Sequence, residues 1–146
     1  MLFELLVIEV TIASEKVLSF MFYRPPSSST KKYLDKFEEF AKMVSSKKRK
    51  IILMGDFNIN TSSISHDSST SAPSSTLATD FLTTSLAAGF VPSFWITTRV
   101  TNQNVSIIDN QLVNFPVGSC DVILTDVSDH FILMSEFLWY SGEKVK

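Results

Sequence analysis

The residues best suited to chemistry follow the apolar run at residues 51–54. Gly55 ends that run, and Asp56 and Asn58 come next, two positions apart. On an extended backbone, side chains with this spacing point to the same face. A carboxylate beside a carboxamide at the carboxyl end of a buried strand is not core material. The pair indicates a place where a metal ion, a water molecule and a phosphate group meet.

Two further polar groups adjoin predicted strands. Asp109 lies inside the otherwise apolar run 105–113, and a buried lone carboxylate is costly unless it is paired. Asp129 and His130 directly precede the last apolar run. A bond between Asp109 and His130 would fix the imidazole tautomer and raise its basicity. Either residue alone would favour a simpler interpretation, an edge carboxylate or a capping histidine; together with Asp56 they favour a site.

Apolar periodicity predicts the elements that position these groups. Strands are expected at residues 5–8, 17–23, 51–57, 94–100, 105–113, 122–124 and 131–139, and helices at 31–46 and 77–88. This order predicts an α/β or α+β sandwich. The Ser- and Thr-rich stretch 61–76 is expected to be a poorly ordered rim loop near Asn58, with His66 as an exposed bystander.

Composition narrows the class of protein. A chain of 146 residues with 45% hydrophobic residues fits one globular domain with a substantial core. The net charge of −2 gives no general attraction for polyanions, so nucleic acid would need a local patch such as residues 47–50. A solvated helix end is the simpler interpretation of that stretch. Cys120 is the only cysteine, which excludes an internal disulfide. No signal peptide and no apolar run of membrane-spanning length is visible.

Four motifs occur in a characteristic order and spacing: Tyr23-Arg24-Pro25-Pro26, Gly55-Asp56-Phe57-Asn58, Thr98-Arg99 with Ser106-Ile107-Ile108-Asp109, and Ser128-Asp129-His130. They resemble those of the endonuclease/exonuclease/phosphatase superfamily, which includes DNase I, apurinic endonucleases, sphingomyelinases and inositol polyphosphate phosphatases. Within it, the chain most resembles the apurinic-type endonuclease domain of non-LTR (LINE-type) retrotransposons. The Tyr-Arg-Pro-Pro turn and the Thr-Arg pair are typical of those elements.

The resemblance implies a four-layer DNase I-like sandwich of two mixed sheets flanked by helices. It also implies hydrolysis of phosphodiester bonds in DNA with Mg²⁺ or Mn²⁺. The implied roles are as follows: Asp56 activates or orients the attacking water and contacts the metal, Asn58 binds the scissile phosphate, Asp109 and His130 stabilise the pentacovalent phosphate, Asp129 is a metal-side carboxylate, Tyr23 stabilises the transition state, and Arg99 binds substrate. Oxygen ligands of this kind suit a hard cation.

The chain departs from the family at its beginning. Family members carry a strand ending in Asn and a metal-binding Glu before the position equivalent to Phe3-Glu4. Here Met1 follows the place where both should occur, and Glu4 and Glu9 lie in the wrong motif to replace that Glu. We therefore expect a partial domain at residues 1–140 with a tail at 141–146. We also expect an unpaired sheet edge or exposed apolar surface, and weak or absent cleavage.

Three interpretations stay open. The first is a DNA endonuclease domain, intracellular and nuclear if functional, with a reverse transcriptase region in a longer parent protein. The second is a non-catalytic retroelement remnant. The third is a phosphatase or sphingomyelinase of the same superfamily, and fold alone does not separate these substrates. The Tyr-Arg-Pro-Pro and Thr-Arg motifs favour the nucleic-acid branch.

Overall fold

A five-stranded sheet forms the centre of the computed structural model, which describes residues 2–12, 14–62, 64 and 76–138. Its strands, in their order across the sheet, are β1 (Glu4–Ile12), β2 (Glu15–Tyr23), β3 (Lys50–Asp56), β7 (Asp109–Val113) and β4 (Val91–Pro92). β2 and β3 are parallel, and the other neighbours are antiparallel. The parallel pair brings the carboxyl ends of β2 and β3, with their polar motifs, to one end of the sheet.

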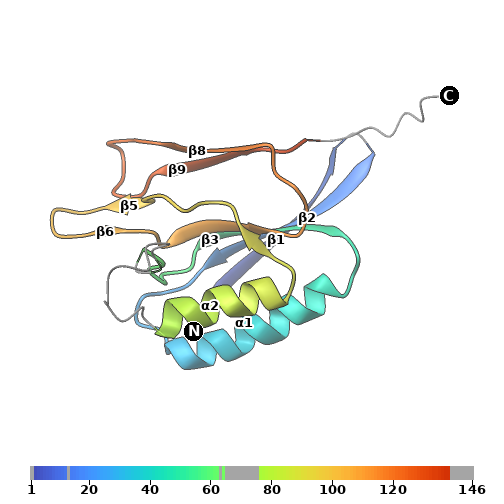
Figure 1. Cartoon of the computed structure of the whole chain (residues 1–146), viewed down its shortest axis with the longest axis horizontal. Coiled ribbons are helices and arrows are strands. Elements are labelled where there is room, and N and C mark those ends of the chain that lie inside the picture. Colours follow the sequence, from blue (N-terminus) through green and yellow to red (C-terminus); the bar gives the residue numbers. More distant parts are fainter. Residues whose placement is uncertain (1, 13, 63, 65–75, 139–146) are drawn as a thin grey trace.

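Two helices, α1 (Thr30–Ser45) and α2 (Thr76–Ala87), cover one face of this sheet (Figure 1). α1 is amphipathic and buries Tyr33, Phe37, Ala41 and Val44, which recur at helical spacing. An aromatic cluster fills the space between helices and sheet; for example, the ring centroids of Phe37 and Phe81 are 5.1 Å apart. Neither described helix has the length and apolar character needed to cross a membrane.

Two hairpins complete the described part of the chain. β8 (Ser119–Ile123) and β9 (Ile132–Glu136) pair with each other and lie on the sheet face opposite the helices (Figure 1). β5 (Arg99–Val100) and β6 (Val105–Ser106) form a short ribbon that projects from one end of the molecule. The predicted sandwich of packed sheets is therefore confirmed. Both described helices lie outside the large sheet.

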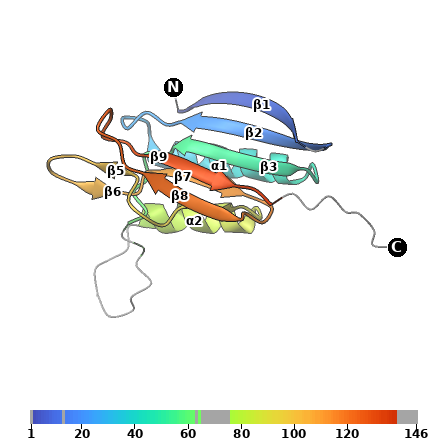
Figure 2. The same cartoon turned by 90° about the horizontal axis from the view of Figure 1, so that it is seen from above.

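The predicted unpaired edge is also confirmed. β1 is an edge strand that pairs only with β2 among the described strands. Its apolar side chains are exposed, with Leu6 at 57% and Val10 at 41% of their full exposure. Seen from above, the β8–β9 hairpin lies towards β3 and β7 and away from β1 (Figure 2). On β2, Val17 and Ser19 are buried, whereas Met21 is exposed. Part of the sheet face that a sandwich normally buries is therefore open.

Several strand predictions differ from the structure. The strand expected at 122–124 is β8, at Ser119–Ile123, and β4 was not predicted. Residues 94–98 are irregular rather than extended, because the Asn110 side chain takes both backbone groups of Phe94. The run 105–113 is interrupted at Ile107 and Ile108, whose carbonyls accept hydrogen bonds from Thr61 and Phe57. Most of the loop 61–76, including His66, and the tail 141–146 lie outside the described residues.

The basic stretch 47–50 lies at the end of β3 that is far from Asp56. Arg49 forms an ion pair with Glu9 at 2.6 Å, and Lys50 forms one with Glu15 at 3.3 Å. Two of its four cations therefore bind acidic side chains of the same sheet. Cys120 lies on β8, where its sulfur contacts the Ser135 hydroxyl at 3.6 Å.

Candidate functional site

Three of the predicted site residues occupy one row across the sheet. Tyr23 on β2 is paired in register with Asp56 on β3, and Asp56 is paired with Asp109 on β7. Side chains at directly paired positions of neighbouring strands lie on the same face of a sheet. The structure therefore brings Tyr23, Asp56 and Asp109 together, as predicted.

The turn after β3 orients the Asp56 carboxylate. Asn58 has a positive φ of 48°, a conformation that asparagine tolerates better than most residues. Its backbone N–H donates to Asp56 Oδ1 at 2.9 Å, and its side-chain amide donates to Asp56 Oδ2 at 3.0 Å. Both carboxylate oxygens are thereby fixed by one neighbour.

Gly55 allows the strand to approach β2 closely at this point. Its φ is +139°, and a Cβ atom there would lie 1.9 Å from the Phe22 carbonyl oxygen. Only glycine satisfies this position, since no side chain could be accommodated without moving the backbone. Because Gly55 permits this close approach, Asp56 can pair with Tyr23 at the end of the sheet.

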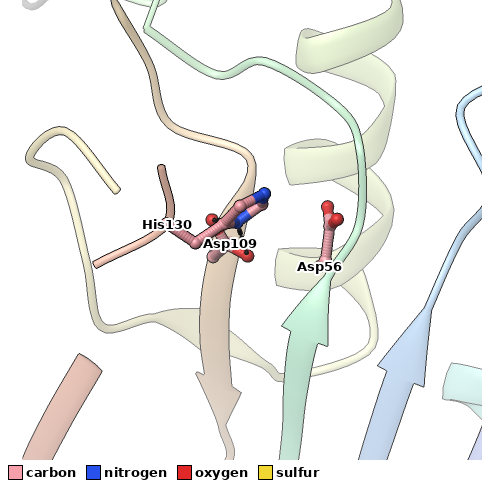
Figure 3. Close-up of side chains that lie close together, drawn as sticks. All are labelled: Asp56, Asp109 and His130. Carbon is pink, nitrogen blue, oxygen red and sulfur yellow. Dashed lines mark hydrogen bonds and ion pairs between the residues drawn. The ribbon is translucent and has the colours of Figure 1, made fainter. Parts of the chain in front are cut away.

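His130 and Asp109 form the predicted pair (Figure 3). The imidazole Nδ1 lies 3.0 Å from Asp109 Oδ1 and 2.9 Å from Oδ2. An isolated antiparallel β-bridge pairs the backbone of His130 with that of Arg99 and holds the histidine in place. The carboxylate favours the tautomer with a proton on Nδ1, which leaves Nε2 as an acceptor in the neutral ring.

Sequence reasoning missed two positions next to these groups. Thr98 is fully buried, and its hydroxyl donates to Asp109 Oδ2 at 2.9 Å. Arg24 is 3% exposed and contacts the turn at residues 56–58. Both belong to motifs that carried the resemblance, yet neither had been given a role. A signal was present: each is a polar residue beside an apolar stretch, which requires a partner if it is buried.

Asp129 and Arg99 lie beside the site and bind each other. Arg99 Nε donates to Asp129 Oδ2 at 2.7 Å, and this bond lowers the pKa of Asp129. Within the described chain, the side chains that could jointly hold a cation are Asp56, Asp109 and His130, whose ligand atoms lie within 4.8 Å of one another. Asp129 is not a member of that group.

The electrostatics of Asp56 fit a divalent cation. Burial raises the pKa of Asp56; the backbone N–H of Asn58 lowers it, and the nearby Asp109 carboxylate raises it again. A half-buried carboxylate with oriented oxygens and no cationic side chain bonded to it gains from a hard metal ion. The Asp56 carboxylate therefore fits a hard divalent cation.

A cavity of about 300 Å³ opens beside this row of residues. Asp56 and Asp109 line this cavity, together with the apolar side chains of Met21, Met54 and Leu133. The site therefore has room next to its carboxylates rather than being sealed by packing.

Comparison with solved structures places the fold. The endonuclease domain of TRAS1, a telomere-specific non-LTR retrotransposon, superposes with a TM-score of 0.67 at 15% identity, over 92% of this chain and 62% of that domain. The 3′-5′ exonuclease NExo from Neisseria meningitidis gives a TM-score of 0.66 at 21% identity, over 91% of this chain and 65% of the exonuclease. A structure of the 3′ phosphatase NExo from Neisseria bound to a product DNA hairpin gives 0.64 at 19% identity, over 91% and 65%.

The chain thus spans less than two thirds of the length of these structures. No curated protein sequence matches it. The sequence profile described as endonuclease-reverse transcriptase matches residues 17–134, which include every predicted site residue. The chain therefore belongs to the endonuclease-reverse transcriptase family, and it has the DNase I-like fold of the endonuclease/exonuclease/phosphatase superfamily.

Proposed function

We propose that this chain is a metal-dependent phosphodiester hydrolase domain that acts on DNA, as part of a retrotransposon protein. The observation that supports the proposal most directly is the row of Tyr23, Asp56 and Asp109, with His130 bonded to Asp109. No protein nucleophile is needed for this chemistry, because water attacks the phosphorus. A DNA substrate, a linked reverse transcriptase region and a nuclear location belong to the same proposal.

Asp56 is the proposed base. Its raised pKa makes it a stronger proton acceptor than an ordinary aspartate, and Asn58 aims its two oxygens. Asn58 is proposed to bind the scissile phosphate. Its amide donates to Asp56 Oδ2 and, at 2.7 Å, to the Arg24 carbonyl, so a phosphate bond would replace one of these.

His130 and Asp109 are proposed to act on the charge that develops on the phosphate. A protonated imidazole keeps its Nδ1–H on Asp109 and offers Nε2–H to a phosphate oxygen. The hydroxyl of Tyr23, a residue that is 45% exposed, is proposed to donate to the same group. Arg99 would contribute the guanidinium edge that Asp129 does not occupy.

Asp56 would hold the Mg²⁺ or Mn²⁺ ion, and Asp129 is the proposed second carboxylate. Such an ion, when bound, neutralises charge on the phosphate and lowers the pKa of its bound water. Ligation by Asp129 would require this carboxylate to turn away from Arg99. Asp109 is less available, since His130 and Thr98 already donate to its oxygens.

Nicking of supercoiled plasmid with Mg²⁺ or Mn²⁺ tests the proposal. We expect His130→Ala and Asp56→Asn to abolish nicking, while Glu15→Gln, at the far end of the sheet, leaves it unchanged. Release of inorganic phosphate from a 3′-phosphorylated oligonucleotide, without nicking, would favour the phosphatase alternative. Absence of both activities in the parent chain at high protein and Mn²⁺ concentrations would favour a non-catalytic remnant.

A further inference from the structure

We infer that Arg24 is a positioning residue of the hydrolytic site: its guanidinium and its backbone together hold the turn at residues 56–58 in the conformation that aims Asp56. The inference concerns the same site and rests on the proposed function. It assigns a role to the arginine of the Tyr-Arg-Pro-Pro motif, which touches none of the proposed reacting atoms.

Arg24 contacts every residue of the turn. Its backbone N–H donates to the Asp56 carbonyl at 2.9 Å, which extends the β2–β3 ladder one residue beyond the Tyr23–Asp56 pair. Its Nη1 donates to the Asn58 carbonyl at 2.9 Å and more distantly to the Phe57 carbonyl at 3.5 Å. The turn therefore cannot shift relative to β2 without breaking hydrogen bonds to both the backbone and the side chain of Arg24.

The bonds between Arg24 and Asn58 are reciprocal. The guanidinium binds the Asn58 carbonyl, and the Arg24 carbonyl accepts the Asn58 side-chain amide at 2.7 Å. The same amide donates to Asp56 Oδ2. A non-glycine residue with positive φ carries a conformational cost, which these bonds offset. Arg24 thus acts on the Asp56 carboxylate through Asn58.

Arg24 is itself anchored from the opposite side. Its Nη2 donates to Thr30 Oγ1 at 2.8 Å and to the Ser28 carbonyl at 3.0 Å, at the start of α1. The guanidinium carbon lies 5.2 Å from the centre of the Tyr33 ring. Nη1 of the planar guanidinium therefore binds the turn at residues 56–58, while Nη2 binds the start of α1.

Lysine cannot reproduce this arrangement. Its ammonium is a compact charge, whereas the guanidinium presents donors in two fixed directions. A lysine at position 24 would retain the positive charge but lose either the turn or the helix anchor. Arg24→Lys therefore separates the positioning role from a general electrostatic one.

The experiment compares Arg24→Lys with Val44→Ala, a core variant in α1 that lowers stability without touching the turn. Three measurements are made on each folded protein: the NMR shifts of the Asn58 side-chain amide, Mn²⁺ affinity from paramagnetic broadening, and kcat for nicking. We expect Arg24→Lys to shift the amide signals, weaken Mn²⁺ binding and lower kcat on the order of 10²-fold with KM little changed. Val44→Ala should preserve all three.

If Arg24→Lys does not fold, Thr30→Val provides the test, because it removes one anchor of the guanidinium with a nearly isosteric side chain. It should shift the Asn58 amide in the same direction by a smaller amount. Unchanged amide signals and Mn²⁺ affinity in the folded Arg24 variant, or equal losses in Val44→Ala, would overturn the inference. If the parent chain does not nick DNA, the proposed function fails, while the amide signals still decide the role of Arg24.

Discussion

The hydroxyl of Thr98 donates a hydrogen bond to Asp109 Oδ2, the same carboxylate that binds His130 Nδ1. The hydroxyl also accepts the backbone N–H groups of Ile108 and Asp109, both at 3.1 Å. A threonine hydroxyl has one proton and two lone pairs, so all of its hydrogen-bonding capacity is used. The buried Thr98 and the partly exposed His130 therefore both bind the Asp109 carboxylate and fix its orientation.

Replacing Thr98 tests this arrangement. Thr98→Val keeps the shape but leaves two buried N–H groups without an acceptor, so we expect it to lower the free energy of unfolding by about 2 kcal/mol or more. Thr98→Ser keeps the hydroxyl and should retain most of the stability. Urea denaturation measures both. The NMR signals of the His130 ring should move in the valine variant alone; equal behaviour of the two variants would contradict the role given to the hydroxyl.

Gly55 and Gly89 form a matched pair for the next prediction. Both have positive φ, but a Cβ at Gly55 would collide with the Phe22 carbonyl, whereas nothing lies within 4 Å of one at Gly89. Gly55→Ala should therefore cost roughly 3 kcal/mol or more, from overpacking and strain together. Gly89→Ala should lower the free energy of unfolding by only about 1 kcal/mol, because it adds the strain of a positive φ without a steric collision. Thermal and urea unfolding measure the difference, and similar losses in both variants would show that the close approach is easily relieved.

The raised pKa of Asp56 has a consequence for stability. A carboxyl whose pKa is higher in the folded than in the unfolded protein binds protons more tightly when folded. Its charged form therefore destabilises the fold, and this penalty appears as pH rises above the ordinary aspartate range. Without divalent cations, the melting temperature of Asp56→Asn relative to the parent should increase from acidic to neutral pH. A difference that stays flat or falls over that range would contradict the burial argument.

Much of this fold follows from local sequence, because long runs with one period dominate it. The strands at β1, β2 and β3 and both helices were predicted from apolar periodicity. The pairing of Asp109 with His130 was predicted on other grounds, the cost of burying a lone carboxylate and the family resemblance. The prediction of a strand at 94–98 was wrong. The β-branched and aromatic residues of this segment favour a strand, but the backbone of Phe94 is hydrogen-bonded to the side chain of Asn110, which is distant in the sequence. The sequence indicated that Thr98 and Arg24 need partners if they are buried, but it could not identify those partners, since they are contacts made across the chain.

The open edge of β1 leads to a prediction about association. Charged side chains on an edge strand discourage pairing with another chain. The one charge near the middle of β1 is Glu9, and it is neutralised by ion pairs with Lys16 and Arg49. Leu6→Lys places an unpaired charge on an exposed position and should reduce self-association without loss of stability. Light scattering over a concentration series measures the first effect and thermal unfolding the second. Met43→Lys, on an exposed helix position, serves as the control for added charge, and an equal gain there would assign the effect to net charge.

Cation binding should be weak and should depend on Asp56. Of the described side chains that could hold a cation together, Asp109 and His130 already bind each other. Each oxygen of Asp56 accepts one hydrogen bond, from Asn58, and keeps a second lone pair for a cation. A catalytic Mg²⁺ ion usually binds one or two carboxylates, with waters completing its octahedron. We expect Asp56→Asn to abolish Mn²⁺ binding, Asp129→Asn to weaken it, and Glu15→Gln to leave it unchanged. Paramagnetic relaxation of water protons gives the affinities. Tight binding that survives Asp56→Asn would place the cation elsewhere in the protein and remove the main support for Asp56 as the metal-contacting base.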